Sequence, residues 1–358
     1  MKRYVVLCLI VYLLLLLMPL SALGSLEKDK PSGTSAPTGR TGTTAANKAA
    51  TSSSASATAS ASGASAASSA TTAPADEAVF RVLDTKSGKV TTLSEKEFVI
   101  GTVASELYPT YHAEAMKAQA VASYTYYSVK RAKARQNPDP NLKGADFSDV
   151  PATFPDTYTV AGLKERWGDN FDAYYKKITE AVEAVFGKRI LCNGEPIYAF
   201  YHALNSGTTE DAKIVWEVEY PYLKPVASPG DKLSPNYQTV VSFTPEQLSA
   251  ALNKVMEGIS FPDKTETWLG KDIARSSAGT VTKIVFCGKE LTGKQVREAL
   301  DLKSACFSVE YKNNSFQFTV QGYGHGVGMS QYGADYMARQ GSTWQEILTH
   351  YYTGITIQ

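Results

Sequence analysis

A tract without bulky side chains divides this sequence and limits how much of it can form a hydrophobic core. Residues 31–75 are almost entirely Ser, Ala, Thr and Gly, and they include no aromatic residue and no Val, Leu, Ile or Met. Such a segment cannot bury enough apolar surface to offset the entropy lost on ordering. We therefore expect a disordered linker over residues 24–78 and folded structure over residues 79–358.

An apolar segment precedes this linker. Lys2 and Arg3 are followed by a leucine-rich run that reaches Leu23, and basic residues ahead of such a run are typical of an export signal. The run approaches the roughly 20 residues that a helix needs to cross a bilayer. We expect residues 1–23 to be a single-pass membrane anchor, with the bulk of the chain outside the cytoplasm. Cleavage within residues 21–24 would instead release the protein.

Charge and cysteine content argue against several classes of protein. The formal net charge is +1, whereas nucleic-acid-binding domains usually carry a basic surface, so we expect no nucleic-acid partner. Three cysteines follow the apolar segment, and none of them has Cys-x-x-Cys spacing: Cys192, Cys287 and Cys306. We expect buried thiols, with a Cys287–Cys306 disulfide as the alternative, and neither a metal site nor a cofactor.

Periodicity and capping signals predict a mixed α+β fold for residues 79–358. Ser94 and Glu97 form a capping box at the start of a helix, and Thr244 begins another before Pro245. The irregular alternation of helices and strands favours the α+β class. The segments expected to be helical are 94–107, 112–135, 172–186, 329–340 and one after residue 342; the expected strands are 79–83, 197–202, a hairpin over 307–320 and a short strand at the end of the chain.

The first segment that suggests chemistry is Ser105-Glu106-Leu107-Tyr108-Pro109, which is followed by a second helix with the sequence Lys-Ala-Gln-Ala-Val-Ala. Glu106 falls in the last turn of the predicted helix, where the negative end of the helix dipole disfavours a carboxylate. Apolar neighbours would disfavour the charge as well. Both effects raise the pKa of Glu106, which suits a general acid near pH 7. A solvent-facing glutamate without a catalytic role is the alternative.

The second segment runs from Tyr198 to Glu210, where a predicted strand enters a turn rich in hydrogen-bonding groups. Aromatic rings beside amide and hydroxyl groups suit sugars, because sugars have apolar faces and many hydroxyls. Ser206 paired with His202 or His325 would instead indicate a Ser-His hydrolase. A structural turn without ligand contacts is the third interpretation.

The third segment, residues 322–333, places glycines at alternate positions ahead of a helix. Glycine allows positive φ angles and a close approach of the backbone to a ligand, and the free amides at a helix start bind anions or hydroxyls. His325 lies at the centre of this loop. No Gly-Lys-Ser/Thr follows, which excludes a P-loop, and His325 has no ligand partner at helical spacing, which argues against zinc.

In these three segments the chain resembles the stage II sporulation protein D family. The resemblance implies a large two-lobed domain with a substrate cleft, and a lytic transglycosylase that acts on peptidoglycan strands lacking stem peptides. Glu106 matches the catalytic glutamate of that family, which would protonate the oxygen between N-acetylmuramic acid and N-acetylglucosamine and then accept the proton of the muramic C6 hydroxyl, giving 1,6-anhydro ends. The side chains expected to bind the sugars are Gln119, Tyr201, His202, Ser206, His325, Ser330 and Gln331.

The resemblance also implies a setting and partners. It points to remodelling of the septal wall during engulfment in sporulation, at the engulfing membrane of the mother cell, with the stage II sporulation amidase protein P and membrane protein M as partners. Some relatives carry a zinc site of Cys and His in the loop after the second helix, but residues 145–158 contain neither residue type, so we expect no zinc there. The alternative function is that of a glycan-binding activator of a cell-wall amidase, without catalysis.

Overall fold

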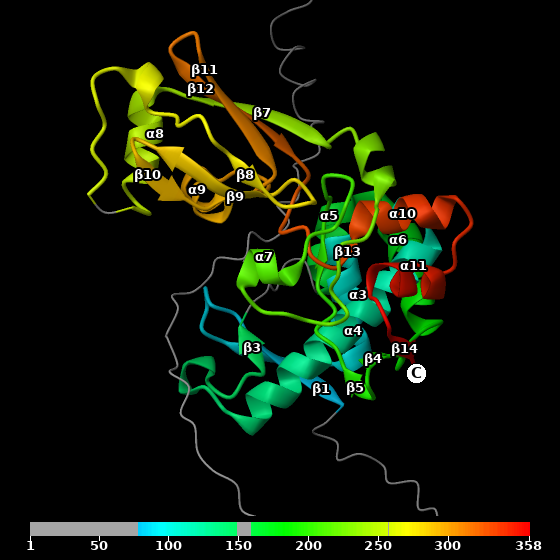
Figure 1. Ribbon diagram of the computed structural model, residues 1–358. Helices are drawn as coiled ribbons and strands as arrows, with labels where there is room; N and C mark the ends of the chain where they lie inside the picture. Colours follow the sequence, from blue (N-terminus) through cyan, green and yellow to red (C-terminus); the bar gives the residue numbers. More distant parts are fainter. Residues whose placement is uncertain (1–77, 149–158, 257) are drawn as a thin grey trace, which may run out of the picture. The chain divides into compact units, whose positions relative to one another are not determined.

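The computed structural model describes residues 78–148, 159–256 and 258–358 (Figure 1). The predicted membrane anchor, residues 1–23, lies outside this range, as does all of the predicted linker except residue 78. Among the described helices, none combines the length and the hydropathy that crossing a bilayer would require.

The described residues mix helices and strands, which confirms the predicted α+β class, and they build two hydrophobic cores. The first core combines residues from both ends of the described chain, between Phe80 and Tyr352, and the second lies within a continuous stretch from Leu248 to Val320. The segment that contains the second core, residues 238–321, therefore interrupts the sequence that forms the first core, and we call it the insertion.

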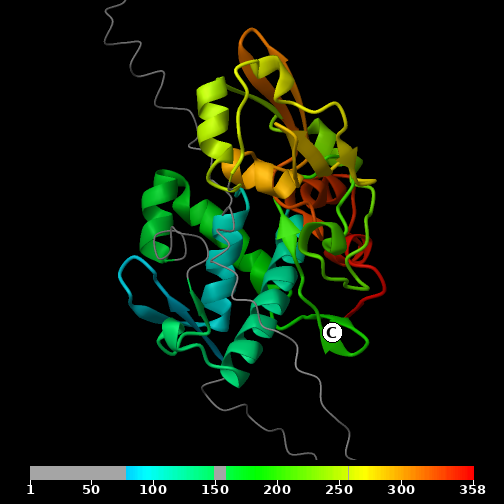
Figure 2. The same ribbon diagram turned by 60° about the vertical axis from the view of Figure 1, so that its left-hand side comes forward.

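The elements outside the insertion are β1 (Val79–Leu83), β2 (Val90–Ser94), α3 (Glu95–Glu106), α4 (Ala113–Gln136), β3 (Phe147–Ser148), α5 (Val160–Trp167), α6 (Phe171–Glu183), β4 (Ile190–Cys192), β5 (Glu195–Pro196), β6 (Tyr201–His202), α7 (Ala212–Trp216), β13 (Met329–Ser330), α10 (Gln331–Arg339), α11 (Trp344–Tyr351) and β14 (Thr356–Ile357). Helix α4 is central to this core, because it packs against α3, α6, α10 and α11 (Figures 1 and 2). Four of its alanines are buried, Ala115, Ala118, Ala120 and Ala122, and small side chains allow several helices to approach it at once.

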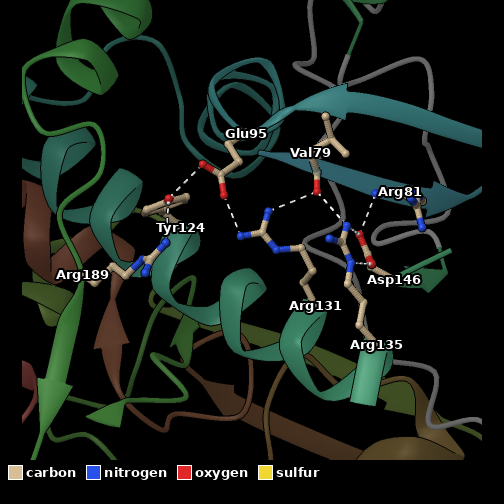
Figure 3. A network of polar contacts seen from close by, with 8 residues as sticks. All are labelled: Val79, Arg81, Glu95, Tyr124, Arg131, Arg135, Asp146 and Arg189. Atoms are coloured by element: carbon tan, nitrogen blue, oxygen red, sulfur yellow. Dashed lines mark hydrogen bonds and ion pairs between the residues drawn. The ribbon is translucent and has the colours of Figure 1, made fainter. Parts of the chain in front are cut away.

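A polar network fixes α4 to β1 and to the start of α3 (Figure 3). Arg131 donates to Glu95 at 2.6 Å and to the carbonyl of Val79 at 3.1 Å. Arg135 donates to the same carbonyl and binds Asp146 through both Nε and Nη2. Because Glu95 is the first residue of α3, the network fixes the beginning of the helix that ends at Glu106.

The insertion contains β7 (Gln238–Phe243), α8 (Pro245–Leu252), β8 (Ala274–Arg275), β9 (Val281–Phe286), β10 (Lys289–Leu291), α9 (Gly293–Leu300), β11 (Phe307–Lys312) and β12 (Ser315–Gln321). Antiparallel pairing gives the strand orders β11-β12-β7 and β10-β9-β8. Helices α8 and α9 pack against these strands and against each other (Figures 1 and 2). The alternating burial of β12 places its three buried residues, Phe316, Phe318 and Val320, in the second core.

Several local predictions are confirmed and others need correction. The capping boxes at Ser94 and Thr244 begin α3 and α8, and the hairpin turns at Asn313 and Asn314, both with positive φ. The strand expected over residues 197–202 is only the two-residue β6, and the helix expected from 329 begins at Gln331. Cys192, Cys287 and Cys306 are free thiols, so the alternative of a disulfide is wrong. The expectation of burial is confirmed only for Cys306, because Cys192 and Cys287 are partly exposed.

Candidate functional site

Two short parallel strands bring the second and third segments together. Tyr201 pairs with Met329 and His202 pairs with Ser330. Nearby, Glu210 donates its amide to the carbonyl of Gly326 at 2.7 Å. The turn after β6 and the glycine loop before α10 therefore form one structure, although the whole insertion separates them in the sequence.

Glu106 is the last residue of α3, and its carboxyl group is held against the start of α10. Gln331 donates from Nε2 to Oε2 of Glu106 at 3.0 Å, whereas Oε1 has no hydrogen-bond partner among the described residues. Glu106 is only partly exposed, and burial raises its pKa to about 7 against the opposing effect of the Gln331 hydrogen bond. The raised pKa expected from the sequence is thus present, and its cause is desolvation.

Contacts around the end of α3 keep Glu106 in place. Arg166 donates to the carbonyl of Ala104 at 3.2 Å, in the last turn. In the following loop, Lys177 donates to the carbonyls of Pro109 and Tyr111 at 2.9 and 2.6 Å. Orphan carbonyls at a helix end need such donors; Arg166 of α5 supplies one for α3, and Lys177 of α6 holds the loop that follows.

The pKa of Glu106 predicts how stability depends on pH. Between the ordinary value of 4.5 and the folded value of about 7, the folded state holds a proton that the unfolded state has released, so the free energy of unfolding falls as pH rises. We expect Glu106→Gln to be more stable than the parent at pH 8 by about 1–3 kcal/mol. That advantage should disappear at pH 4. Urea unfolding of both proteins at the two pH values measures it, and an equal difference at both would contradict it.

Asp231, which the sequence did not single out, is a buried hub beneath the two segments. It lies in the 3-10 helix η3 (Pro229–Leu233) and is 0% exposed. Its carboxylate accepts hydrogen bonds from the amide and Nδ2 of Asn205, from Ser228 and, at 2.5 Å, from Ser330. Burial raises the pKa of Asp231 to about 6 despite these donors. No pattern marks Asp231, because a single Asp after Pro-Gly is an ordinary turn sequence.

Ser330 connects this hub to Glu106. Its hydroxyl also accepts from the amide of Gly333 at 3.1 Å and so caps α10. The next residue is Gln331, which binds Glu106. Asp231 therefore fixes the beginning of the helix that orients the Glu106 carboxyl group.

The two histidines pack together as neutral rings. His202 is 4% exposed, its Nδ1 lies 3.1 Å from the carbonyl of Val327, and burial lowers its pKa to about 4. Its Nε2 is buried without a partner in the described part of the chain. His325 accepts from the amide of Val327 at 3.1 Å, and burial lowers its pKa too. The His325 ring centroid lies 5.7 Å from that of His202 and 4.9 Å from that of Trp216.

The remaining predicted residues differ in their surroundings. Ser206 donates its hydroxyl to the carbonyl of Ala278 at 2.6 Å and is hydrogen-bonded to neither histidine, so the geometry does not favour a Ser-His hydrolase. Gln119 is fully buried, with Nε2 donating to Ser123 and Oε1 unpartnered among the residues described. Tyr201 is partly exposed.

The structure thus divides the predicted site into groups. Glu106 and Gln331 form one pair, and Ser206 and His325 both line a pocket of about 320 Å³ to which neither member of that pair contributes. Gln119, His202 and Ser330 are buried. Among the described residues, no three His, Cys, Asp or Glu side chains are grouped to hold a metal ion; the stretch 145–158 lies partly outside those residues.

Gly328 is needed where the glycine loop passes β6. Its φ is +74°, and a Cβ at this position would lie 2.0 Å from the carbonyl oxygen of Phe200. We expect Gly328→Ala to lower the free energy of unfolding by about 2–4 kcal/mol through strain and overlap. Gly341 is the matched control, because its φ is +98° but no atom of the described residues, its chain neighbours aside, lies within 4 Å of the place a Cβ would take. Equal losses in the two variants, measured by urea unfolding, would contradict the role of the close approach.

Comparison with known proteins finds clear similarity. The family model described as SpoIID, stage II sporulation protein, matches residues 84–191, a range that includes Glu106. Stage II sporulation protein D of Bacillus subtilis (strain 168) is 36% identical over 285 residues, which cover 80% of this chain and 79% of that protein. The protein of the same name from Bacillus amyloliquefaciens is 35% identical with the same coverage. The amidase enhancer of Bacillus subtilis (strain 168) is 27% identical over 311 residues, covering 72% of this chain and 40% of that protein.

Proposed function

Because the chain belongs to the stage II sporulation protein D family, we propose that it is a peptidoglycan lytic transglycosylase in which Glu106 is the single acid and base. The observation that carries this proposal is the environment of Glu106. Its carboxyl is partly buried, has a pKa of about 7 and is oriented through one oxygen by Gln331. A group with that pKa can both donate and accept a proton near neutral pH.

The reaction needs only one carboxyl group. Protonated Glu106 gives its proton to O4, the oxygen that joins muramic C1 to glucosamine C4, and the C1–O4 bond breaks. The resulting carboxylate accepts the proton of the muramic C6 hydroxyl, and O6 bonds to C1. The products are a 1,6-anhydro-muramic end and a free glucosamine O4 hydroxyl, the glutamic acid is regenerated, and no water is consumed. Hydrolytic glycosidases, in contrast, use two carboxyl groups.

In this proposal the sugars bind in the substrate cleft that the resemblance to the family implies. Tyr201, Ser206 and His325, which are partly exposed, contact the glycan in this proposal. Gln119, His202 and Ser330 are buried and hold the contacting loops in place. Gln331 orients Glu106.

Product analysis tests the proposal directly. Purified full-length protein is incubated with glycan strands from which the stem peptides have been removed, and the products are identified by mass spectrometry. We expect ends that are lighter by one water than the products of hydrolysis, as a 1,6-anhydro ring requires. Ends carrying a free reducing sugar would contradict the proposal.

The similarity to an amidase enhancer favours a second candidate, a glycan-binding activator of a cell-wall amidase. An activator needs the surface that binds glycan, but it does not need Glu106 as a proton donor. It predicts faster release of stem peptides by an added sporulation amidase without new anhydro ends. Measuring both products in one reaction separates the two candidates.

The proposed setting follows the family. The protein is held in the engulfing membrane by residues 1–23, with residues 79–358 outside the cytoplasm, and it remodels the septal wall during sporulation. Its proposed partners there are the amidase protein P and membrane protein M of stage II sporulation. The amidase would supply the peptide-free strands that the transglycosylase cleaves.

A further inference from the structure

A pocket with several cationic side chains lies beside the glycine loop. Its volume is about 320 Å³, within the range of sites for small ligands. The second segment, the glycine loop and the insertion all contribute to its wall. The residues that matter for its chemistry are Thr208, Glu210, Lys213, Lys294, Arg297 and His325.

The charges in this pocket leave a net attraction for an anion. Lys213, Lys294 and Arg297 face two carboxylates, those of Glu210 and Glu217. Glu210 is 2% exposed and already accepts hydrogen bonds from the hydroxyl of Ser276 at 2.5 Å and the amide of Asp211 at 2.9 Å. Its charge is therefore partly satisfied within the protein.

Arg297 is the cation best placed to hold a ligand. Its Nε donates to the carbonyl of Leu302 at 3.2 Å, which fixes the side chain, and none of the ion pairs in the described residues includes its guanidinium group. Arg297 and His325, the centre of the glycine loop, line the same pocket. A partly buried guanidinium group favours a carboxylate partner, which it can bind through two parallel hydrogen bonds.

The proposed substrate carries such a group. When an amidase removes a stem peptide, it hydrolyses the amide on the lactyl ether of the muramic acid and leaves a free carboxylate. An intact strand has a neutral amide and a peptide at the same place. Each muramic residue of a peptide-free strand therefore has one negative charge that distinguishes it from unprocessed wall.

We propose that this pocket binds the free lactyl carboxylate of a muramic residue, with Arg297 as the principal ligand and Lys213 and Lys294 adding attraction. The inference rests on the proposed function, because it assumes that the ligand is peptidoglycan glycan. It explains a preference for peptide-free strands by charge recognition at a place separate from Glu106. Apolar side chains in the same wall, Ile214, Val215 and Val281, suit the methyl group of the lactyl ether.

Binding to two chemically matched glycans tests the proposal. Full-length protein carrying Glu106→Gln, which avoids cleavage during the measurement, is titrated with peptide-free strands and with the same strands after their carboxylates are converted to methyl amides. We expect the acid strands to bind roughly tenfold more tightly, as a charge-assisted hydrogen bond implies. Equal affinities for the two strands would overturn the proposal.

Variants locate the effect. Arg297→Gln should reduce the ratio of the affinity for acid strands to that for amide strands to near one. Lys294→Glu changes an exposed residue, so it does not threaten folding, and it should reduce the same ratio severalfold. Lys254→Glu, an exposed change at a residue that does not line the pocket, should leave the ratio unchanged. A ratio that Lys294→Glu and Lys254→Glu alter equally would contradict the assignment to this pocket.

The outcomes also separate this inference from the proposed function. Anhydro ends formed by the parent protein together with equal binding of both strands would retain the transglycosylase and reject the pocket. Selective binding of the acid strands without anhydro ends would retain the pocket and reject the transglycosylase.

Discussion

Replacing Glu106 with Gln is expected to lower the rate of anhydro-muramic product formation by about 10³–10⁴-fold. One group acting as both acid and base contributes through two proton transfers, and such transfers each account for factors of about 10²–10⁴. Glutamine has nearly the same volume and can still accept the hydrogen bond from Gln331, but it cannot exchange a proton. The measurement is the initial rate of anhydro ends from peptide-free strands.

Two comparisons make this result specific. Glu266→Gln, at an exposed position in the insertion, should leave the rate unchanged, and Glu106→Gln should retain its affinity for glycan. Full activity in Glu106→Gln would reject the catalytic role. Undiminished stimulation of an amidase by that variant, with no anhydro ends from the parent, would favour the activator instead.

Removing the carboxylate of Asp231 is expected to cause the largest loss of stability. Asp231→Ala leaves donors from Asn205, Ser228 and Ser330 without their acceptor in a buried site. Unsatisfied buried polar groups cost about 1–3 kcal/mol each, although neighbouring groups relax together. We expect the free energy of unfolding to fall by about 3–5 kcal/mol, as measured by urea unfolding at pH 7.5.

A matched surface change and a smaller core change support the interpretation. Asp263→Ala, at an exposed position, should alter stability by less than about 0.5 kcal/mol. Ser330→Ala removes one donor and the cap of α10 and should cost about 1–2 kcal/mol. If Asp231→Ala unfolds no more easily than Asp263→Ala, Asp231 is not the hub described above.

Local signals predicted where helices begin, because they involve residues close in sequence. The capping boxes of α3 and α8 depend on side chains three residues apart and formed as expected. The apolar run before β6 suggested a strand over residues 197–202, but the strand has only two residues, and the Phe200 carbonyl has two partners from the end of the chain. Its carbonyl accepts from the amide of Met329 and the hydroxyl of Tyr352. Those partners are distant in the sequence, so no local pattern could identify them.

The same limit applies to the candidate site. Glu106 could be selected from its place at a helix end, and burial raised its pKa in the direction expected. The hydrogen bond from Gln331 joins residues 225 positions apart, and the bond from Ser330 to Asp231 joins residues 99 apart. Sequence motifs named Gln331 and Ser330 without saying what either contacts, and they gave no reason to choose Asp231.

The pairing of β6 with β13 has a consequence for the order of folding. The segment that orients Glu106 and closes the first core lies beyond the whole insertion, so the site cannot assemble until that late part of the chain has been synthesised. Contacts this distant in sequence form slowly. A chain truncated before α10 would therefore carry Glu106 without the helix whose Gln331 binds its carboxyl group.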